Sequence, residues 1–228
     1  DNILLNVHLG SSYYSLYMLP LLLVCPFKII RTLLTIIVCL AVFSSVKRGG
    51  VLALALAVIA YIITNQYVTK HGKFTKIIIG VCVLVGFAAI FAYIGTLGDN
   101  NVFERFESIQ EDGGSGRTDV WEEAWRLINS QDILHFIIGN GFNAVVHSSR
   151  YVLSAHNDYL EAWYDFGIIG MGLYVLAMLS LFKDIIICIK VKKQYAPAMA
   201  ALGAIILVLS MISHIAIYYW FNVVVLSI

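Results

Sequence analysis

Residues 154–188 read SAHNDYLEAWYDFGIIGMGLYVLAMLSLFKDIIIC, and this stretch decides the fold class. Its second part, Phe166–Cys188, is apolar and long enough for a transmembrane helix, which needs about 20 such residues. Its first part is polar and begins with Ser154, a frequent N-cap residue. We therefore predict one helix that starts near His156 and ends at Cys188, about 50 Å long at 1.5 Å per residue. Because this exceeds the thickness of a bilayer, its first turns are expected to project into the outer interface.

The rest of the chain has the same apolar character. Of its 228 residues, 60% are hydrophobic and 13% are charged, whereas a soluble domain has about 25% charged residues. This composition excludes a soluble enzyme, a disordered chain and a coiled coil. The net charge of +1 gives no indication of nucleic-acid binding. The four cysteines show neither disulfide nor zinc spacing. The sequence thus predicts an all-α integral membrane protein, a polytopic transmembrane helical bundle.

The apolar runs divide the chain into three regions. Residues 1–97 are expected to form about four transmembrane helices, residues 98–165 one long loop, and residues 166–228 two more spans and part of a third. The chain begins without Met and stops inside an apolar run, so we expect it to be a fragment of a larger membrane protein. The predicted spans are Tyr13–Cys25, Ile29–Val46, Val51–Val68, Ile77–Leu97, Phe166–Cys188, Ala196–Ile212 and, in part, Ile215–Ile228.

The distribution of charge orients these spans. If Lys28 and Arg31 lie inside, the stretches Lys70–Lys76 and Lys183–Lys193 lie inside as well, and this face carries nine of the fifteen lysines and arginines. Cytoplasmic loops are enriched in these residues. The loop over residues 98–165 holds twelve of the fourteen acids and is therefore predicted to be extracytoplasmic. Because an unstructured loop of this length is uncommon, we expect short amphipathic helices within it.

One amphipathic helix is predicted around Trp121. Asp119 followed by Glu122 resembles a capping box at a helix N-terminus. We expect this helix to lie on the membrane or against the bundle, with its tryptophans at the headgroup level. Four apolar side chains recur at the spacing of one helix face: Trp121, Ala124, Trp125 and Ile128.

Two arginines on the outer face are candidate anion-binding residues. Arg117 stands just before the predicted helix, where backbone N–H groups and a guanidinium together can hold a phosphate. Arg48 lies in the short turn of residues 47–50 between two spans, where cations are costly to translocate and often mark a site. The alternatives are that Arg117 pairs with a nearby acid and that Arg48 only caps a helix turn. Residues 139–141 (GNG) indicate a turn, with an anion-binding nest as the alternative.

His156 is the candidate base. Close to a helix N-terminus the imidazolium is disfavoured, so the ring is expected to be neutral and able to accept a proton from a hydroxyl. A structural hydrogen bond is the alternative, and metal binding is disfavoured because no second ligand lies at helical spacing. In a continuous helix Gly167 and Gly170 lie within about 40° of His156 and allow a helix or a lipid tail to approach. Three acids of the same helix are expected to form a solvated or pairing surface rather than a catalytic dyad: Asp158, Glu161 and Asp165.

Four segments resemble bacterial O-antigen ligases and O-antigen polymerases. The pattern of His156-Asn157, nine residues, Gly167, two residues and Gly170 is similar to the signature of this family. The resemblance as a whole extends over roughly residues 36–182. The other three agree in order and in sidedness: residues 44–50 (SSVKRGG), 115–121 (SGRTDVW) and 138–142 (IGNGF).

The resemblance implies a multispanning, metal-independent glycosyltransferase without a cofactor, active on the extracytoplasmic face of the bacterial cytoplasmic (inner) membrane. Its donor would be a glycan on undecaprenyl pyrophosphate, and its acceptor lipid A-core for a ligase or another glycan for a polymerase. By the same resemblance, Arg48 and Arg117 would hold the pyrophosphate, and His156 would orient or deprotonate the acceptor hydroxyl. Four further residues would contact the substrates: Trp121, Asn157, Gly167 and Gly170.

One departure bears on the choice between ligase and polymerase. Ligases typically follow the second glycine of the signature with Thr-x-x-Thr-Gly, whereas residues 171–174 read MGLY here. A polymerase of O-antigen, capsule or another surface polysaccharide is therefore at least as well supported as a ligase.

Two other classes of protein compete with an enzyme. A membrane transporter predicts ionisable residues near the middle of its spans, but no predicted span has a charge at its centre. A non-catalytic subunit of a surface-polysaccharide export assembly would give Arg48, Arg117 and His156 no joint role. Substitution of these three residues separates this class from an enzyme.

Overall fold

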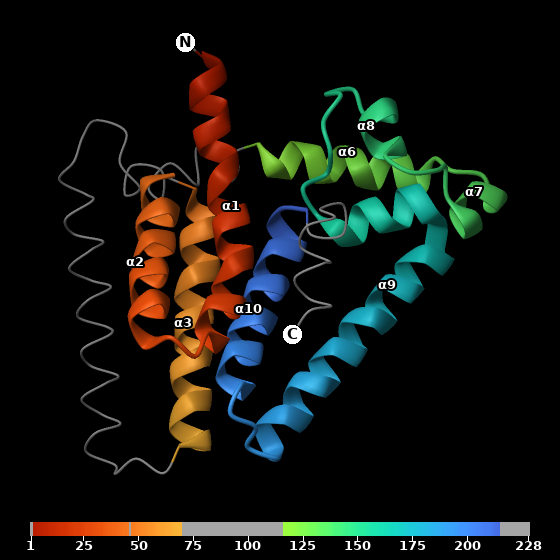
Figure 1. Cartoon of the computed structure of the whole chain (residues 1–228). Coiled ribbons are helices and arrows are strands. Elements are labelled where there is room, and N and C mark those ends of the chain that lie inside the picture. Colours follow the sequence, from red (N-terminus) through yellow and green to blue (C-terminus); the bar gives the residue numbers. More distant parts are fainter. Residues whose placement is uncertain (1, 46, 70–115, 215–228) are drawn as a thin grey trace. The chain divides into compact units, whose positions relative to one another are not determined.

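The computed structural model describes residues 2–45, 47–69 and 116–214, which form helices and no strand (Figure 1). The all-α prediction is confirmed for this part of the chain. The predicted spans over residues 77–97 and 215–228 lie outside the described residues. The helices are α1 (Asn2–Val24), α2 (Lys28–Ser44), α3 (Arg48–Val68), α6 (Arg117–Asn129), α7 (Ile133–Ile138), α8 (Ala144–Ser148), α9 (Asp158–Lys190) and α10 (Ala196–Ile212).

Two stretches of the described residues are long and apolar enough to cross a membrane. They are Gly49–Val68 in α3, with a mean hydropathy of 1.9, and Asp158–Lys190, which is α9, with a mean hydropathy of 2.0. Tyr13–Val24 and Ala196–Ile212 are shorter apolar helices. These helices agree with predicted apolar runs, while the number of membrane crossings and their orientation stay predictions.

The chain divides into two compact units. Among the described residues, the first unit comprises residues 2–45, 47–69 and 184–205, and the second comprises residues 116–183 and 206–214. Helices α1, α2 and α3 belong to the first unit, and α6, α7 and α8 to the second. The sequence-based division at residues 97 and 165 stays a prediction.

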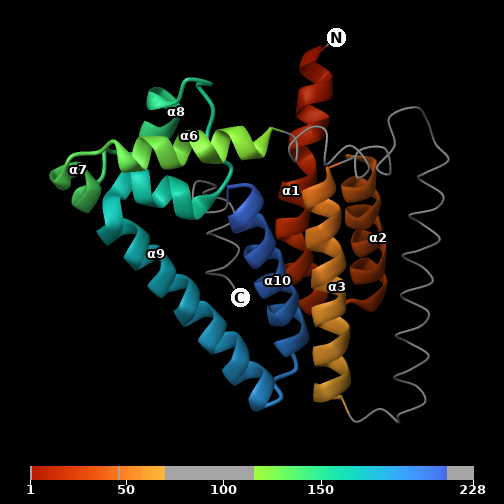
Figure 2. The same cartoon turned by 180° about the vertical axis from the view of Figure 1, so that it is seen from behind.

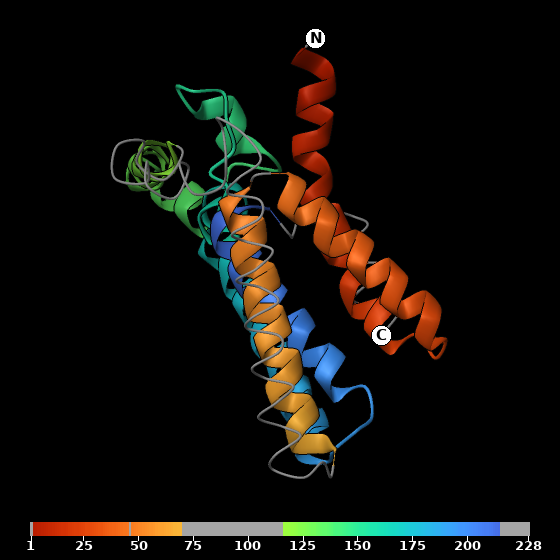
Figure 3. The ribbon, with the colours of Figure 1, turned by 90° about the vertical axis from the view of Figure 1, so that its left-hand side faces the viewer.

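In the first unit, α1, α2 and α3 pack against one another, and α1 and α2 lie side by side (Figure 3). Helix α1 ends at Val24 because Pro26 disfavours the helical conformation of Cys25. The turn between α2 and α3 is tied to α1, since Nζ of Lys47 lies 4.5 Å from the centre of the Tyr13 ring. Large side chains of the three helices are fully buried, among them Leu16, Tyr17, Leu19, Phe43 and Leu54.

In the second unit, α6 packs along the first turns of α9 (Figure 2). Glu123 of α6 is buried, whereas Trp125 is 45% exposed, so the predicted apolar stripe of this helix is only partly right. Trp121 and Trp163 pack against the core from its edge. The core consists of Ala124, Leu127, Ile128, Val145, Ala155, Leu160 and Tyr164.

Helix α9 is bent at Gly167, which has a φ of 68° and a ψ of −174°. The predicted continuous helix is therefore wrong, and so is the common meridian of His156, Gly167 and Gly170. A Cβ atom at Gly167 would overlap the carbonyl oxygen of Ile137, so only glycine fits this left-handed backbone at this close approach. Of the two neighbours expected for Gly167, a helix or a lipid tail, the structure shows a helix: the backbone at the end of α7 lies against this glycine.

The turn of residues 139–141 satisfies the backbone carbonyls that the bend leaves without helical partners. The N–H of Asn140 donates to the Tyr164 carbonyl at 3.1 Å, and the N–H of Gly141 donates to the Asp165 carbonyl at 2.8 Å. The Asp165 carboxylate accepts from the N–H groups of Asn143 at 2.7 Å and Val145 at 3.0 Å. This segment is a turn, as predicted, and it docks on α9 through backbone contacts.

Candidate functional site

Arg117 and His156 line one pocket of about 270 Å³ in the second unit. The structure thus brings together two of the three residues singled out as catalytic from the sequence. Arg117 comes from the start of α6, and His156 from the loop that precedes α9. The pocket is lined by Gly116, Arg117, Asp119, Val120, Tyr151, Leu153 and His156.

Arg117 is the first residue of α6, not the residue before it. The helix follows Gly116, which has a φ of 72°, and no side chain caps it, so the predicted capping box of Asp119 and Glu122 is wrong. Four of the residues that line the pocket belong to this helix start. The positive end of the helix dipole therefore meets the pocket beside a guanidinium, an arrangement suited to an anionic group. The Asp119 carboxylate shares the pocket and limits the net positive charge there.

His156 lies before α9 rather than in its first turn, and its backbone is left-handed with a φ of 50°. The helix begins at Asp158, and Asn157 caps it: its Oδ1 accepts from the N–H groups of Tyr159 at 3.0 Å and Leu160 at 3.2 Å. The predicted N-cap at Ser154 is therefore wrong by three residues. The N–H of His156 donates to Oγ of Ser154 and to Oε1 of Glu161, each at 3.1 Å.

Helix α6 holds the loop that carries His156. Nε1 of Trp121 donates to the carbonyl of Ala155 at 2.9 Å, next to His156. The Glu123 carboxylate accepts from the backbone N–H of Arg150 at 3.1 Å and binds the Arg126 guanidinium through two hydrogen bonds. The hydrogen bonds from Arg126, and secondarily that from Arg150, lower the pKa of Glu123 to about 2. A permanently ionised carboxylate thus anchors the loop in the neutral pH range.

All four residues proposed to contact substrate have structural roles in the described part of the chain. Asn157 caps α9 and also donates from Nδ2 to the Met211 carbonyl at 3.2 Å. Gly167 permits the bend of α9, and Gly170 makes room for the side chain of Phe166, since a Cβ atom there would overlap that of Phe166. The indole of Trp121 holds the loop before His156 by its hydrogen bond to the Ala155 carbonyl.

Arg48 is the first residue of α3, in the first unit. Its side chain lies outside what the structure describes, so its proposed role at the pyrophosphate stays a prediction.

Sequence reasoning missed that acids of α9 are buried. Asp158, Glu161 and Asp165 are 2%, 5% and 3% exposed, so the expected surface position is wrong, whereas the alternative that these acids pair with neighbours agrees with their contacts. Oδ2 of Asp158 accepts from the Tyr174 hydroxyl at 2.8 Å, and Oε1 of Glu161 lies 3.1 Å from Nδ1 of His214. Their spacing was a signal, because residues at i, i+3 and i+7 share one helix face.

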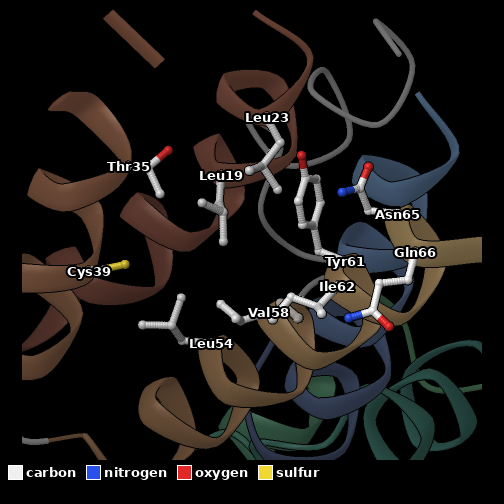
Figure 4. A pocket seen from close by; sticks show the side chains of 11 residues that line it. Leu19, Leu23, Thr35, Cys39, Leu54, Val58, Tyr61, Ile62, Asn65 and Gln66 are labelled. Carbon is white, nitrogen blue, oxygen red and sulfur yellow. The ribbon is translucent and has the colours of Figure 1, made fainter. Parts of the chain in front are cut away.

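A second pocket, also of about 270 Å³, lies in the first unit among α1, α2 and α3 (Figure 4). Apolar side chains such as Leu19, Leu54 and Val58 form most of its wall, with the amides of Asn65 and Gln66 near the end of α3 (Figure 4). None of the residues that line it is a carboxylate, a histidine or a basic side chain. This lining therefore offers no histidine or carboxylate for general acid–base catalysis, whereas the pocket of Arg117 contains His156. Within the described ranges, no group of three His, Cys, Asp or Glu side chains is arranged to hold a metal ion.

Comparison with known proteins gives one match. A family model described as O-antigen ligase matches residues 33–175, which include the pocket of the second unit and the start of α3. No curated protein and no solved structure gives a significant match.

Proposed function

Because the chain belongs to the O-antigen ligase family, we propose that it is a membrane glycosyltransferase that moves a glycan from undecaprenyl pyrophosphate to an acceptor sugar hydroxyl. The reaction takes place at the extracytoplasmic face of the bacterial cytoplasmic membrane. The observation that carries the proposal is the pocket that Arg117 and His156 line together. Family membership supports an O-antigen ligase or polymerase type of function, with lipid-linked glycan and polysaccharide substrates.

The arginines serve the leaving group in the proposed reaction. As the bond between the anomeric carbon and the pyrophosphate oxygen breaks, negative charge builds up on that oxygen. A guanidinium that is already oriented toward the oxygen stabilises this charge. Arg117 supplies one such group together with the start of α6. Arg48 supplies a second cation in this proposal. With two cations on the pyrophosphate, the proposed step needs no metal ion.

His156 serves the acceptor. Its neutral imidazole accepts the proton of the acceptor hydroxyl while that oxygen bonds to the anomeric carbon of the donor. The bond between this carbon and the pyrophosphate oxygen breaks, and its electron pair leaves with the lipid pyrophosphate. The shared pocket supports this assignment, because base and cation must reach the two sides of one reacting carbon.

The glycan ladder of living cells tests the proposal. The full-length protein is produced in a host that lacks its own copy, as wild type, as His156→Ala and as His147→Ala, at equal membrane abundance. His147 is exposed on α8 and outside the pocket, so His147→Ala is the matched control. We expect wild type and control to restore the ladder and His156→Ala to leave it absent. A full ladder with His156→Ala would show that this histidine is structural and would refute the mechanism.

The form of the defect then separates the two branches of the family. Single repeats on the acceptor indicate a lost polymerase, because the first transfer still takes place without elongation. Long chains that remain on undecaprenyl lipid indicate a lost ligase, because elongation proceeds and the final transfer does not. The sequence at residues 171–174 makes the polymerase result at least as well supported as the ligase result.

A further inference from the structure

A cluster of polar side chains contacts His156 and lies outside the lining of the pocket. Glu161 of α9 is 5% exposed, and the side chain of His214, which follows α10, is 12% exposed. Ser154 completes the cluster from the loop before His156. All three belong to the second unit, and none of them lines the pocket.

One carboxylate oxygen connects the members of this cluster. Oε1 of Glu161 lies 3.1 Å from Nδ1 of His214 and accepts from the backbone N–H of His156 at 3.1 Å. The hydroxyl of Ser154 also donates to this oxygen, and it lies 3.0 to 3.1 Å from the ring nitrogens of His214. A buried carboxylate needs such partners to offset its lost hydration. Glu161 has them, and one of them is the backbone of the candidate base.

The His214 ring also contacts the ring of His156 directly. The two ring centres are 4.6 Å apart, with an angle of 42° between the planes. The backbone of His156 is in the left-handed region, which costs free energy for a residue with a Cβ atom and persists only where neighbours hold it. The hydrogen bonds of its N–H group and the contact with His214 provide that restraint.

We propose that Glu161 and His214 are positioning residues for His156, which hold its ring at the pocket and stabilise the imidazolium that it becomes when it accepts a proton. This inference rests on the proposed role of His156 as the base. It adds two residues, far apart in sequence, to which the family signature assigns no part here. Glu161 provides the negative charge, and His214 provides the surface against which the ring packs.

The charges around His156 determine the sign of the expected effect. His156 lines the pocket together with Arg117, Asp119 and Tyr151, and it contacts Glu161 and His214. A nearby negative charge favours the protonated imidazole, and a nearby positive charge disfavours it. Removal of the Glu161 charge therefore shifts the protonation midpoint of His156 to lower pH.

Chemical modification measures this midpoint without any need for substrate. Diethyl pyrocarbonate acylates neutral imidazole, so the pH dependence of its rate at the peptide of His156, read by mass spectrometry, reports the protonation of that ring. The full-length protein in detergent is compared as wild type, as Glu161→Gln, which keeps an acceptor for the His156 N–H, and as Glu122→Gln. Glu122 is exposed on α6 and serves as the matched control. His147 in the same protein serves as the internal reference.

We expect the midpoint at His156 to fall by about one pH unit in Glu161→Gln and to stay unchanged in Glu122→Gln. In His214→Gln we expect the limiting modification rate of His156 at high pH to rise severalfold, because the covering ring is gone. This second variant keeps the proposal testable if Glu161→Gln does not fold. An unchanged midpoint in a folded Glu161→Gln, or an unchanged rate in His214→Gln, would overturn the proposal.

The glycan ladder ties the cluster to function. We expect Glu161→Gln to reduce the ladder at least tenfold and Glu161→Asp, which restores the charge, to recover part of it. A full ladder with Glu161→Gln would overturn the positioning role. The two failures are distinguishable: a full ladder with His156→Ala refutes the proposed function, whereas the modification data test the contacts of Glu161 and His214 with His156 independently of activity.

Discussion

The two parts of α9 on either side of Gly167 are built in different ways. Residues 158–166 carry three acids, and all three are buried with hydrogen-bond partners. Residues 168–190 carry leucines that are 60% to 63% exposed at Leu173, Leu176 and Leu179. The first part is a component of a packed core with satisfied polar groups. The second part turns its apolar side chains outward.

The difference shows how one helix supports the pocket of Arg117 and His156 and also contains a stretch long and apolar enough to cross a membrane. Residues 168–190 are about 34 Å long at 1.5 Å per residue, enough for a hydrocarbon core of about 30 Å. Soluble proteins rarely expose so continuous an apolar surface, and members of this family are membrane proteins. Residues 158–166 leave that direction at the bend and run along α6 (Figure 1). Gly167 therefore separates the part of α9 that supports His156 from the part suited to lipid.

Gly167→Ala is expected to have the largest effect on this division. A Cβ atom there would overlap the backbone of Ile137, and alanine is also strained in the left-handed conformation. We therefore expect the free energy of unfolding to fall by about 3 kcal/mol or more. Thermal unfolding of the full-length protein in detergent measures it. Gly172→Ala is the control, because a Cβ atom at Gly172 has nothing within 4 Å. Equal melting of the two variants would contradict a required bend.

Truncation of one leucine in each part compares the two environments directly. Leu160 is 7% exposed and belongs to the core, whereas Leu176 is 62% exposed. We expect Leu160→Ala to destabilise the protein by about 2 to 4 kcal/mol, because it leaves a cavity. Leu176→Ala is expected to cost less than about 1 kcal/mol in detergent. Similar losses for both, measured by thermal unfolding, would mean that the second part of α9 is as well packed as the first.

Asp165→Asn is expected to weaken the attachment of residues 143–145 to α9 beside the bend at Gly167. Both oxygens of this carboxylate accept from backbone N–H groups, of Asn143 and Val145. The asparagine oxygen accepts only one of these two hydrogen bonds, and its NH₂ group faces the other N–H. We therefore expect the free energy of unfolding to fall by about 1 to 2 kcal/mol. Limited proteolysis of residues 139–149 measures the release of this segment. Protection equal to that of wild type would show that the backbone contacts of the turn suffice without the carboxylate.

The fold class was predictable, because composition and helical length carry that information, and two of the residues that line the pocket were singled out from the sequence. Arg117 and His156 were recognised by their residue types, by their places in the chain and by the family signature. The apolar run after Gly167 was also clear, since about 20 apolar residues require lipid or a large core. These features depend on local sequence.

The bend, the helix starts and the buried acids were not predicted, because each depends on contacts between distant residues. Gly167 was expected to lie in a continuous helix, and only the approach of the Ile137 backbone explains its conformation. The Glu161 carboxylate is buried because His214 and the loop before α9 supply its partners. The helical spacing of the three acids was a visible signal, but sequence alone did not show what they faced.

The smallest expected effect is the dependence of stability on pH that the Glu123 carboxylate introduces. The pKa of Glu123 is about 2 in the folded protein, against an ordinary value of 4.5, because Arg126 and Arg150 hydrogen-bond to the carboxylate. The stability that this ionised group contributes is therefore present above about pH 4.5 and is lost as the pH falls toward 2. The arginine side chains are 44% and 67% exposed, so solvent screening keeps the contribution below about 1 kcal/mol.

Glu123→Gln should therefore be slightly less stable than wild type at pH 7, and the difference should disappear as the pH approaches 2. Tryptophan fluorescence during denaturation in detergent measures this difference in stability. Trp121 and Trp163 pack against the core, and the ring centres of Trp125 and Trp163 are 5.5 Å apart. Glu122→Gln, on the exposed face of the same helix, should match wild type at every pH. A difference between Glu123→Gln and wild type that stays constant from pH 7 to pH 2 would show that the carboxylate acts by its shape and not by its charge.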